Sequence, residues 1–262
     1  MYLFRAVWRL TKLIVLLLAL AADCALRPPR STVDGAERIH RFCRRILGAL
    51  GIIWSCEGEL PEQGGVVSNH LSYLDIFLLA AARPFIMVAK SEVRGWPVIG
   101  WLTARAGTVY VVRGGGPATY PAVNQAMAEA YRSGLPVLFF PEGTTTNGSE
   151  VLPFRRGLFH SVLNEGAPLR TAALAYSVED GKASVADDVC WWGDALLAPH
   201  LFRLAALTGV QATVRFGAEI TARQDRFILS EQAREQVAEM YAGLCVSGAM
   251  VETEQVELIE AL

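Results

Sequence analysis

The chain of 262 residues is long enough to form one large domain or two small ones without disulfides or a structural metal. Hydrophobic residues make up 52% of the chain and charged residues 19%, and this apolar excess excludes a disordered chain. The formal net charge of -2 hides an asymmetry, because nine Lys or Arg and only three Asp or Glu fall within the first 50 residues. The apolar excess and the basic N-terminal end therefore need a common explanation.

The N-terminal segment combines an apolar run with basic residues. Residues 13–22 form the run LIVLLLALAA, which Arg5, Arg9 and Lys12 precede. At about 1.5 Å per residue, a helix of this run covers half of the roughly 30 Å hydrocarbon core of a bilayer. We therefore expect the segment to dip into one leaflet or to lie at the interface. A cleaved signal peptide is the alternative, because a basic start and Ala19-Leu20-Ala21 fit that pattern.

A basic amphipathic helix is predicted after Pro28-Pro29, where Ser31 and Asp34 have the spacing of a capping box. Apolar and basic side chains fall on different faces, with Ile39, Phe42, Ile46, Leu47 and Leu50 on one, and Arg38, His40, Arg41, Arg44 and Arg45 around it. We predict that residues 1–55 form membrane-anchoring helices, with the arginines near anionic headgroups at the cytoplasmic face of the inner membrane. The alternative for the second helix is an apolar face that packs on the protein core.

The rest of the chain has the pattern of an α/β domain, because short apolar runs alternate with helical periodicity from Gly64 onward. Strands are expected at residues 66–68, 85–89, 108–112, 137–140, 171–176 and 213–216. Helices are expected near residues 72–82, 120–132, 158–164, 199–207 and 230–245. We predict a mixed, largely buried sheet flanked by helices and preceded by the N-terminal helical pair. Since no linker divides the remainder, residues 56–262 are predicted to form one catalytic domain.

Several common catalytic motifs are missing from the sequence. There is no G-x-S-x-G nucleophile elbow and no H-E-x-x-H, and the segment Gly143–Gly148 lacks the lysine of a phosphate-binding loop. The four histidines are not spaced with cysteines or acids like a zinc site, so we predict no metal centre. The five cysteines form no C-x-x-C pair, which favours free thiols in a reducing compartment.

The best candidate for chemistry is the segment Asn69-His70-Leu71-Ser72-Tyr73-Leu74-Asp75, between a predicted strand and a predicted helix. Open α/β sheets place their ligands at the carboxyl ends of strands. If Ser72 is the N-cap, Asp75 lies one turn into the helix and can reach back to His70. A carboxylate on one imidazole nitrogen fixes the tautomer and leaves the other nitrogen free as a base. A plain capping box beside a histidine in a turn is the alternative.

Further segments accompany this one in a characteristic order: Lys90-Ser91-Glu92, Trp96-Pro97-Val98-Ile99-Gly100, Gly107–Arg113 and Phe140-Pro141-Glu142-Gly143-Thr144. Together they resemble the glycerolipid acyltransferase family, whose bacterial members include 1-acylglycerol-3-phosphate acyltransferases. The resemblance covers roughly residues 60–180. It implies that a histidine base deprotonates a lysolipid hydroxyl, which attacks the thioester of acyl-CoA or acyl carrier protein. No further cofactor, no metal and no nucleic-acid partner is then expected, and the partners are membrane lipids and the lysolipid acceptor.

The resemblance also implies roles for single residues. His70 is the general base and Asp75 its orienting partner. Substrate binding is assigned to Asn69, Lys90, Arg113, Glu142, Gly143, Thr144 and Arg155. A surface charge at the end of a strand is the alternative for Arg113, and a solvated loop acid is the alternative for Glu142.

One departure from the family pattern bears on the acceptor. Many members continue Glu-Gly-Thr with Arg-Ser, whereas Thr145, Thr146 and Asn147 follow here, so a bidentate phosphate partner is missing. We expect 1-acyl-sn-glycerol-3-phosphate, converted to phosphatidic acid, as the leading acceptor. Lyso-ornithine lipid and lysophosphatidylcholine are the alternatives. A thioester or lipid hydrolase that uses the same histidine, and a non-catalytic membrane-binding relative, are alternatives from other classes.

Overall fold

The structure is a computed structural model that describes residues 2–112, 120–179, 181–221 and 225–260. The strands in chain order are β1 (Ile53–Glu57), β2 (Gly65–Ser68), β3 (Ile86–Lys90), β4 (Val109–Val111), β5 (Val137–Phe139), β6 (Leu169–Val178) and β7 (Val210–Ile220). The α-helices are α1 (Tyr2–Leu26), α2 (Thr32–Leu50), α3 (Leu74–Ala82), α4 (Ile99–Arg105), α5 (Tyr120–Arg132), α6 (Phe159–Asn164), α7 (Leu197–Ala206) and α8 (Arg226–Glu260). Two short helices of other types are η1 (Ser91–Gly95) and η3 (Val185–Val189).

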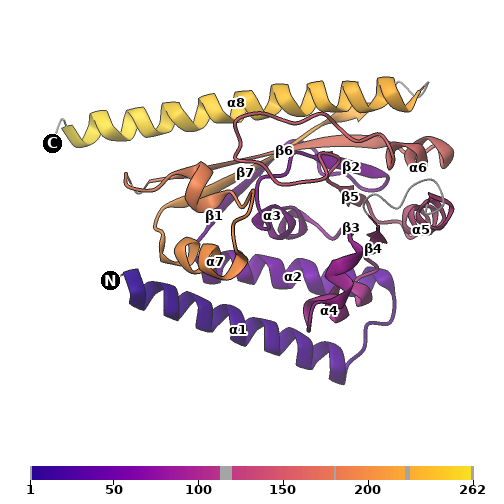
Figure 1. Cartoon of the computed structure of the whole chain (residues 1–262), viewed down its shortest axis with the longest axis horizontal. Helices are drawn as coiled ribbons and strands as arrows, with labels where there is room; N and C mark the ends of the chain where they lie inside the picture. The colour runs from indigo at the N-terminus through magenta and orange to yellow at the C-terminus, as the bar shows by residue number, and fades with distance from the viewer. Residues whose placement is uncertain (1, 113–119, 180, 222–224, 261–262) are drawn as a thin grey trace.

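The strands form a 7-stranded mixed sheet in the order β1-β7-β6-β2-β5-β3-β4. Only β6 and β7 pair antiparallel, and the other neighbours are parallel. The carboxyl ends of β2, β5 and β3 therefore lie side by side at one end of the strands (Figure 1). In parallel sheets the loops at this end assemble a site.

Helices cover both faces of the sheet (Figure 1). One core cluster joins the sheet to α1, α2, α3 and α7, and a second joins it to α5, α6 and α8. The predicted mixed, buried sheet flanked by helices is confirmed. Every predicted strand is present, but β1 was not predicted, and it spans the predicted domain boundary at residue 55.

Helix α2 forms as predicted, with Ser31 as its N-cap: the Ser31 hydroxyl oxygen accepts from the Asp34 N–H at 3.1 Å. Its apolar face, however, packs on the protein. Ile46 and Leu47 are buried in the cluster that also contains Leu78 of α3. The prediction that this face lies in a membrane is therefore wrong, because α3 offers an apolar surface of its own and the two helices bury each other.

The basic residues of α1 have partners within the protein. Arg5 donates to the carbonyl oxygen of Ala206 at 2.8 Å, and Arg9 donates to that of Leu207 at 2.6 Å. Both carbonyls lie at the C-terminal end of α7. The last carbonyls of a helix have no partner within it, so cations stabilise this end.

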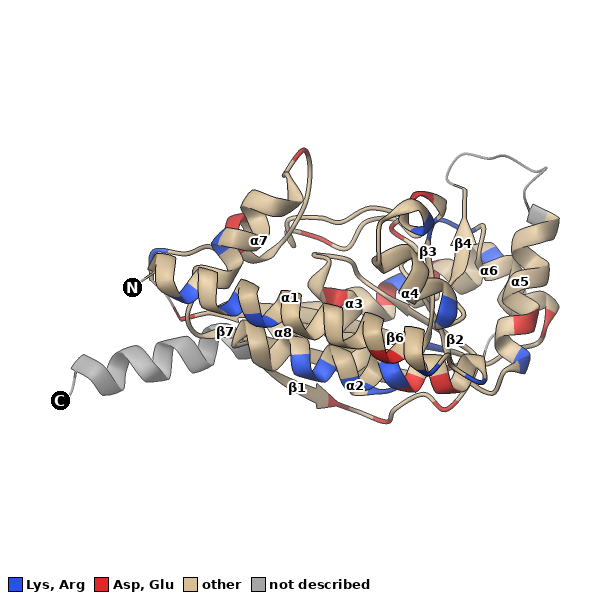
Figure 2. Cartoon of the chain, turned by 90° about the horizontal axis from the view of Figure 1, so that it is seen from below, with Lys and Arg blue, Asp and Glu red and all other residues tan. Residues whose placement is uncertain are grey.

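The basic residues of α2 are used in a similar way. Arg44 reaches the carbonyl of Ala81 near the end of α3, and Arg38 forms ion pairs with Asp23 at 2.9 Å and Asp34 at 3.0 Å. Figure 2 shows the basic residues of α1 and α2 in blue. Part of the N-terminal basic excess thus joins these helices to the rest of the protein instead of facing a lipid surface.

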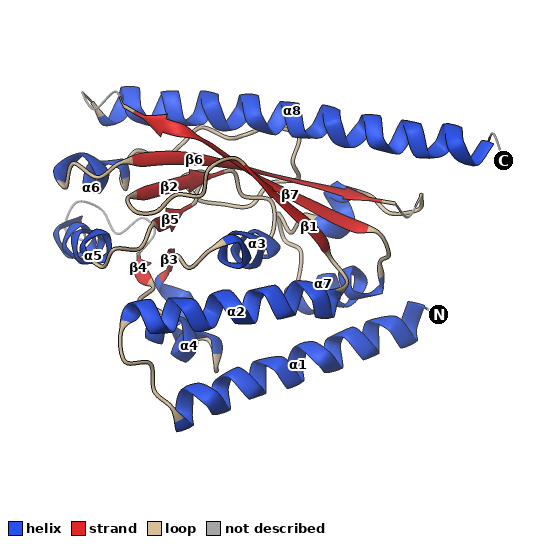
Figure 3. Cartoon of the chain, turned by 180° about the vertical axis from the view of Figure 1, so that it is seen from behind, coloured by secondary structure: helices blue, strands red, loops and turns tan. Residues whose placement is uncertain are grey.

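Helix α1 is the outermost element of its layer, and α2 lies between it and the sheet (Figure 3). One side of α1 packs inward through Ala6, Leu20 and Cys24, which are buried. Large apolar side chains on its other sides are exposed, namely Leu3, Phe4, Val7, Trp8, Ile14, Val15 and Leu18. Among the residues that the structure describes, no helix is both long and apolar enough to cross a bilayer.

Candidate active site

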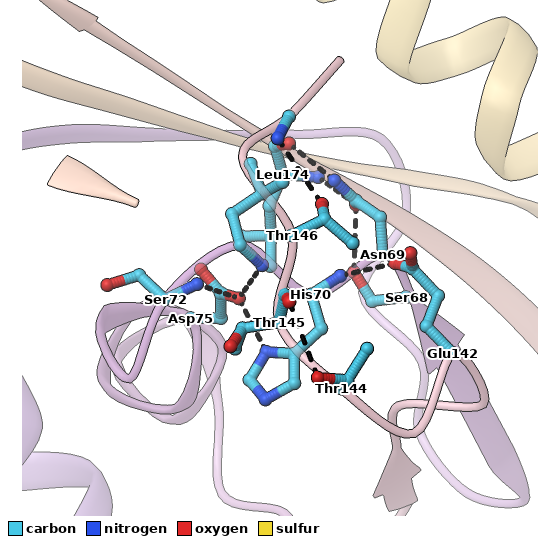
Figure 4. A network of polar contacts seen from close by, with 12 residues as sticks. Ser68, Asn69, His70, Ser72, Asp75, Glu142, Thr144, Thr145, Thr146 and Leu174 are labelled. Atoms are coloured by element: carbon cyan, nitrogen blue, oxygen red, sulfur yellow. Dashed lines mark hydrogen bonds and ion pairs between the residues drawn. The ribbon is translucent and has the colours of Figure 1, made fainter. Parts of the chain in front are cut away.

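The loop between β2 and α3 carries the predicted histidine and aspartate. The helix begins at Leu74 with Tyr73, and not Ser72, as its N-cap, yet Asp75 reaches back to His70 as expected. The Ser72 hydroxyl is buried and has no hydrogen-bond partner among the residues that the structure describes. It is the Asp75 carboxylate that satisfies the loop, because Oδ2 accepts from the backbone N–H of Leu71 at 2.6 Å and of Ser72 at 2.9 Å. The carboxylate thereby folds the loop around itself (Figure 4).

The same oxygen binds the imidazole of His70. Nδ1 of His70 lies 2.7 Å from Asp75 Oδ2, and the Asp75 side chain is 0% exposed while that of His70 is 14% exposed. An ionised carboxylate only accepts hydrogen bonds, so Nδ1 carries the proton and Nε2 is left with its lone pair. The ring also stacks on Phe140, with centroids 3.9 Å apart and an angle of 12° between the planes. The histidine is therefore held in one tautomer and one orientation, as a general base requires.

Glu142 lies beneath the histidine loop and is itself buried. Its Oε1 accepts from the His70 N–H at 2.7 Å and its Oε2 from the Leu152 N–H at 2.9 Å. Burial raises the pKa of this carboxyl to about 7, although the two backbone hydrogen bonds lower it. Glu142 thus joins the loop after β5 to the loop after β2 through the His70 N–H (Figure 4), and both of its oxygens accept from the backbone.

Asn69 connects the histidine loop to β6. Its side-chain NH₂ donates to the carbonyl of Leu174 at 2.9 Å, and its Oδ1 accepts from the Leu174 N–H at 2.8 Å. The amide therefore continues the pairing between β2 and β6 by one residue beyond the end of β2. Asn69 is 1% exposed, so the structure places this predicted substrate-binding residue behind the site.

Gly143 and Arg155 are brought together on the exposed side of the site. Gly143 has φ +73°, and a Cβ at this position would lie 2.7 Å from Nε of Arg155. Both the backbone conformation and the arginine therefore require glycine. Thr144 follows as an exposed residue, and Arg155 is exposed as well. An accessible cation beside a turn near His70 is a suitable partner for an anionic substrate group.

Two predicted binding residues remain, and the structure describes one of them. Lys90 is exposed at the carboxyl end of β3, the strand beside β5. Arg113 lies outside the residues that the structure describes. In the described part of the chain, no group of three His, Cys, Asp or Glu side chains could hold a metal ion.

Two contacts of His70 were not predicted from the sequence. Phe140 stands in the motif Phe140–Thr144, but its type gave no sign that it would stack on an imidazole. Thr146 donates its backbone N–H to the carbonyl of His70 at 2.9 Å, so the segment that departs from the family pattern still supports the histidine. A backbone contact of this kind leaves no trace in the residue type.

Comparisons with known proteins agree with this geometry. A family model described as Acyltransferase matches residues 55–175. A lyso-ornithine lipid O-acyltransferase of Pseudomonas aeruginosa is 38% identical over 204 residues, which are 75% of this chain and 76% of that protein. A 1-acyl-sn-glycerol-3-phosphate acyltransferase of Neisseria meningitidis is 33% identical over 204 residues, 76% of this chain and 78% of that protein.

A solved structure extends the likeness to the whole fold. The crystal structure of the 1-acyl-sn-glycerophosphate acyltransferase PlsC of Thermotoga maritima superposes with a TM-score of 0.70. The match covers 92% of this chain and 95% of that chain at 17% sequence identity. At this identity the likeness shows a shared fold, which includes the regions outside the matched family segment.

Proposed function

The chain belongs to the acyltransferase family, and from this premise we propose that it transfers a fatty acyl group from an acyl thioester to the free hydroxyl of a lysolipid. The observation that carries the proposal is the contact of 2.7 Å between His70 Nδ1 and the buried carboxylate of Asp75. This contact supplies a base of fixed tautomer at the carboxyl edge of the sheet. A thioester is already activated, so the reaction needs no protein nucleophile.

In the proposed reaction, Nε2 of His70 takes the proton of the acceptor hydroxyl while the hydroxyl oxygen attacks the thioester carbonyl. A carbon–oxygen bond forms, the carbon–sulfur bond breaks, and the imidazolium returns the proton to the leaving thiolate. Asp75 stabilises the imidazolium in between. General-base help of this kind contributes about 10²–10⁴ in rate. The free thiol of coenzyme A or of acyl carrier protein leaves as the second product.

The acceptor that we propose is a lysolipid whose headgroup carries an anionic group, either a carboxylate or a phosphate. Arg155 beside Gly143 is an exposed cation that fits such a group, and Lys90 and Arg113 are further candidates from the sequence. Lyso-ornithine lipid, an alternative from the sequence alone, becomes the first candidate because a lyso-ornithine lipid O-acyltransferase is 38% identical. Thr145, which stands where many family members have a phosphate-binding arginine, also favours it. Lysophosphatidate is the second candidate, since a relative that acts on 1-acyl-sn-glycerol-3-phosphate is 33% identical.

We further propose that the enzyme reaches its lipid substrates by resting α1 on a membrane. Leu3 and Phe4 are 68% and 77% exposed, and the exposed apolar side chains continue along the helix to Leu18. Soluble proteins seldom leave a patch of this kind uncovered, and a bilayer interface is the partner that suits a lipid-handling enzyme. With free cysteines among the described residues, we place it at the cytoplasmic face of the inner membrane.

An acceptor panel tests the proposed function. The full chain is assayed in mixed micelles with lyso-ornithine lipid, lysophosphatidate and lysophosphatidylcholine, each with acyl-CoA and with acyl carrier protein as donor. We expect the fastest acyl transfer with lyso-ornithine lipid as acceptor. We expect His70→Ala to lose this transfer. Equal thioester cleavage with and without acceptor would instead support a hydrolase, and full transfer by His70→Ala would contradict the mechanism.

A further inference from the structure

The second carboxylate oxygen of Asp75 has a partner that the family motifs do not contain. Tyr176 of β6 donates its hydroxyl to Asp75 Oδ1 at an O···O distance of 2.5 Å. A fully buried carboxylate needs a donor at each oxygen, and here the phenol supplies one for Oδ1. From this contact we infer that Tyr176 is a positioning residue of the acyl-transfer site, which acts on His70 through Asp75. The inference rests on the proposed role of the His70–Asp75 pair.

The phenol is suited to be a permanent donor. Burial, and after it the charge of Asp75, holds the pKa of Tyr176 well above its usual range, so the hydroxyl keeps its proton at any working pH. The other titratable groups that face it are Tyr73 and Cys190. Among the described contacts neither of them donates to Oδ1, and the Tyr73 hydroxyl is bonded to His200 instead. A phenol-to-carboxylate bond at this short distance belongs to the strong, charge-assisted class.

The two oxygens of Asp75 are loaded unequally. Oδ2 accepts from the His70 ring and from the N–H groups of Leu71 and Ser72, whereas Tyr176 is the side-chain donor at Oδ1. The bond at Oδ1 fixes rotation of the carboxylate and draws negative charge away from the histidine side. Without it, more charge rests on Oδ2, so the imidazolium is held more tightly and returns its proton to the thiolate less readily.

Tyr73 provides a matched control for the loss of a buried phenol hydroxyl. Its hydroxyl lies 3.1 Å from Nδ1 of His200, whose Nε2 is bonded to the carbonyl of Cys190 at 2.9 Å. The Tyr73 side chain is within the same buried cluster, yet its hydroxyl has no bond to Asp75 among the described contacts. Tyr73→Phe therefore removes the same group from the same region without touching the carboxylate.

The test compares Tyr176→Phe with Tyr73→Phe by measuring kcat, KM and the pH profile of kcat/KM for the acyl transfer. For Tyr176→Phe we expect kcat to fall about 3- to 10-fold, with KM for both substrates changed by less than about twofold. We also expect the acid limb of its profile to move to higher pH by about half a unit to one unit. Tyr73→Phe should keep the wild-type profile even if its thermal stability falls.

A double-mutant cycle shows whether Tyr176 acts through Asp75. In an Asp75→Asn background, Tyr176→Phe should change kcat by less than about twofold, because the carboxylate that it positions is gone. A rate loss in Tyr176→Phe with an unmoved pH profile would assign it a structural role and overturn the inference. So would an undiminished effect in the Asp75→Asn background. If His70→Ala is inactive while Tyr176→Phe behaves like Tyr73→Phe, only this inference fails; an active His70→Ala would refute the proposed function itself.

Discussion

The active-site loops and the N-terminal helix α1 follow opposite rules. In the loops, Asn69, Asp75 and Glu142 are buried polar residues whose side-chain oxygens all accept hydrogen bonds. On α1, Leu3 and Phe4 are large apolar residues that are mostly exposed to solvent. The first arrangement depends on single atoms, because a buried polar group without a partner costs about 1–3 kcal/mol.

The second arrangement depends on area, because many exposed side chains each contribute a little to contact with an apolar phase. Substitutions in the loops should therefore change catalysis steeply and one residue at a time. Substitutions on α1 should change membrane binding gradually, and they should leave the chemistry intact.

The largest effect is expected for Asp75→Asn. The amide keeps the shape of the carboxylate but carries no charge, so the imidazolium loses the negative charge that stabilises it. We expect kcat to fall about 10³–10⁴-fold while circular dichroism and cooperative unfolding stay close to wild type. Destabilisation without a specific loss of rate would instead leave Asp75 only the role of holding the loop. Single substitutions in the loops would then not change catalysis steeply.

The second effect is a pH dependence of the free energy of unfolding that comes from Glu142. Its carboxyl has a raised pKa of about 7 in the folded protein, against 4.5 for the free group. The folded state therefore binds this proton more tightly than the unfolded state. The contribution is fully present below about pH 4.5 and is lost as pH rises toward 7. Each unit of the shift corresponds to about 1.4 kcal/mol.

Glu142→Gln removes this titration and provides the measurement. The free energy of unfolding is determined in urea for both proteins between pH 4.5 and 8. The difference, wild type minus variant, should decrease by roughly 2–3 kcal/mol over that range. A difference that stays constant with pH would show that Glu142 is ionised throughout. Burial would then not control the protonation of this carboxyl, and the contrast with α1 would be weaker.

The sheet could be predicted because buried strands leave long apolar runs in the sequence. Strand β1 was missed because it lies at the edge of the sheet, where Ile53 is 65% exposed and Ser55 and Glu57 interrupt any apolar pattern. The fate of α2 was misjudged for a related reason. An amphipathic pattern shows that one face is apolar, but whether that face meets lipid or α3 depends on a partner far along the chain.

The contact between His70 and Asp75 could be predicted because the two residues are only five positions apart, in the loop that joins a strand to a helix. Tyr176 could not, since its contact with Asp75 joins residues 101 positions apart and gives no local signal. Glu142 was found from its motif, but its motif did not reveal that both oxygens bind backbone N–H groups. Sequence motifs therefore located the loops, whereas the hydrogen bonds between loops needed the fold.

The third effect is on membrane binding by α1. Ile14→Ser combined with Leu18→Ser removes two side chains that are 57% and 59% exposed, so the fold should persist. We expect partitioning into anionic vesicles, measured by co-sedimentation, to fall at least about tenfold, with acyl transfer in mixed micelles unchanged. Ile228→Ser on α8 is the matched control, since Ile228 is 49% exposed on the opposite layer. Equal losses for both variants would contradict a specific role of α1.

The smallest effect tests the loop around Val98, which shares features of both regions. Val98 has φ +63° and ψ -54°, and the N–H of Ile99 donates to the carbonyl of Pro97 at 2.6 Å. This is a γ-turn with a β-branched residue at its centre, a conformation that costs about 1–3 kcal/mol. The turn leaves Trp96, Val98 and Ile99 exposed, so the strain presents apolar side chains outward as α1 does.

Val98→Gly should remove the strain, because glycine adopts a positive φ without a Cβ conflict. The gain exceeds the extra entropy of glycine in the unfolded chain, so we expect stabilisation of about 1 kcal/mol and a Tm higher by roughly 2–4 °C. Val112→Gly is the control, because Val112 is exposed without a positive φ and should lose stability. If Val98→Gly is more stable but binds vesicles less well, the strained turn serves to present an apolar surface. A single residue would then have a large effect outside the catalytic loops as well.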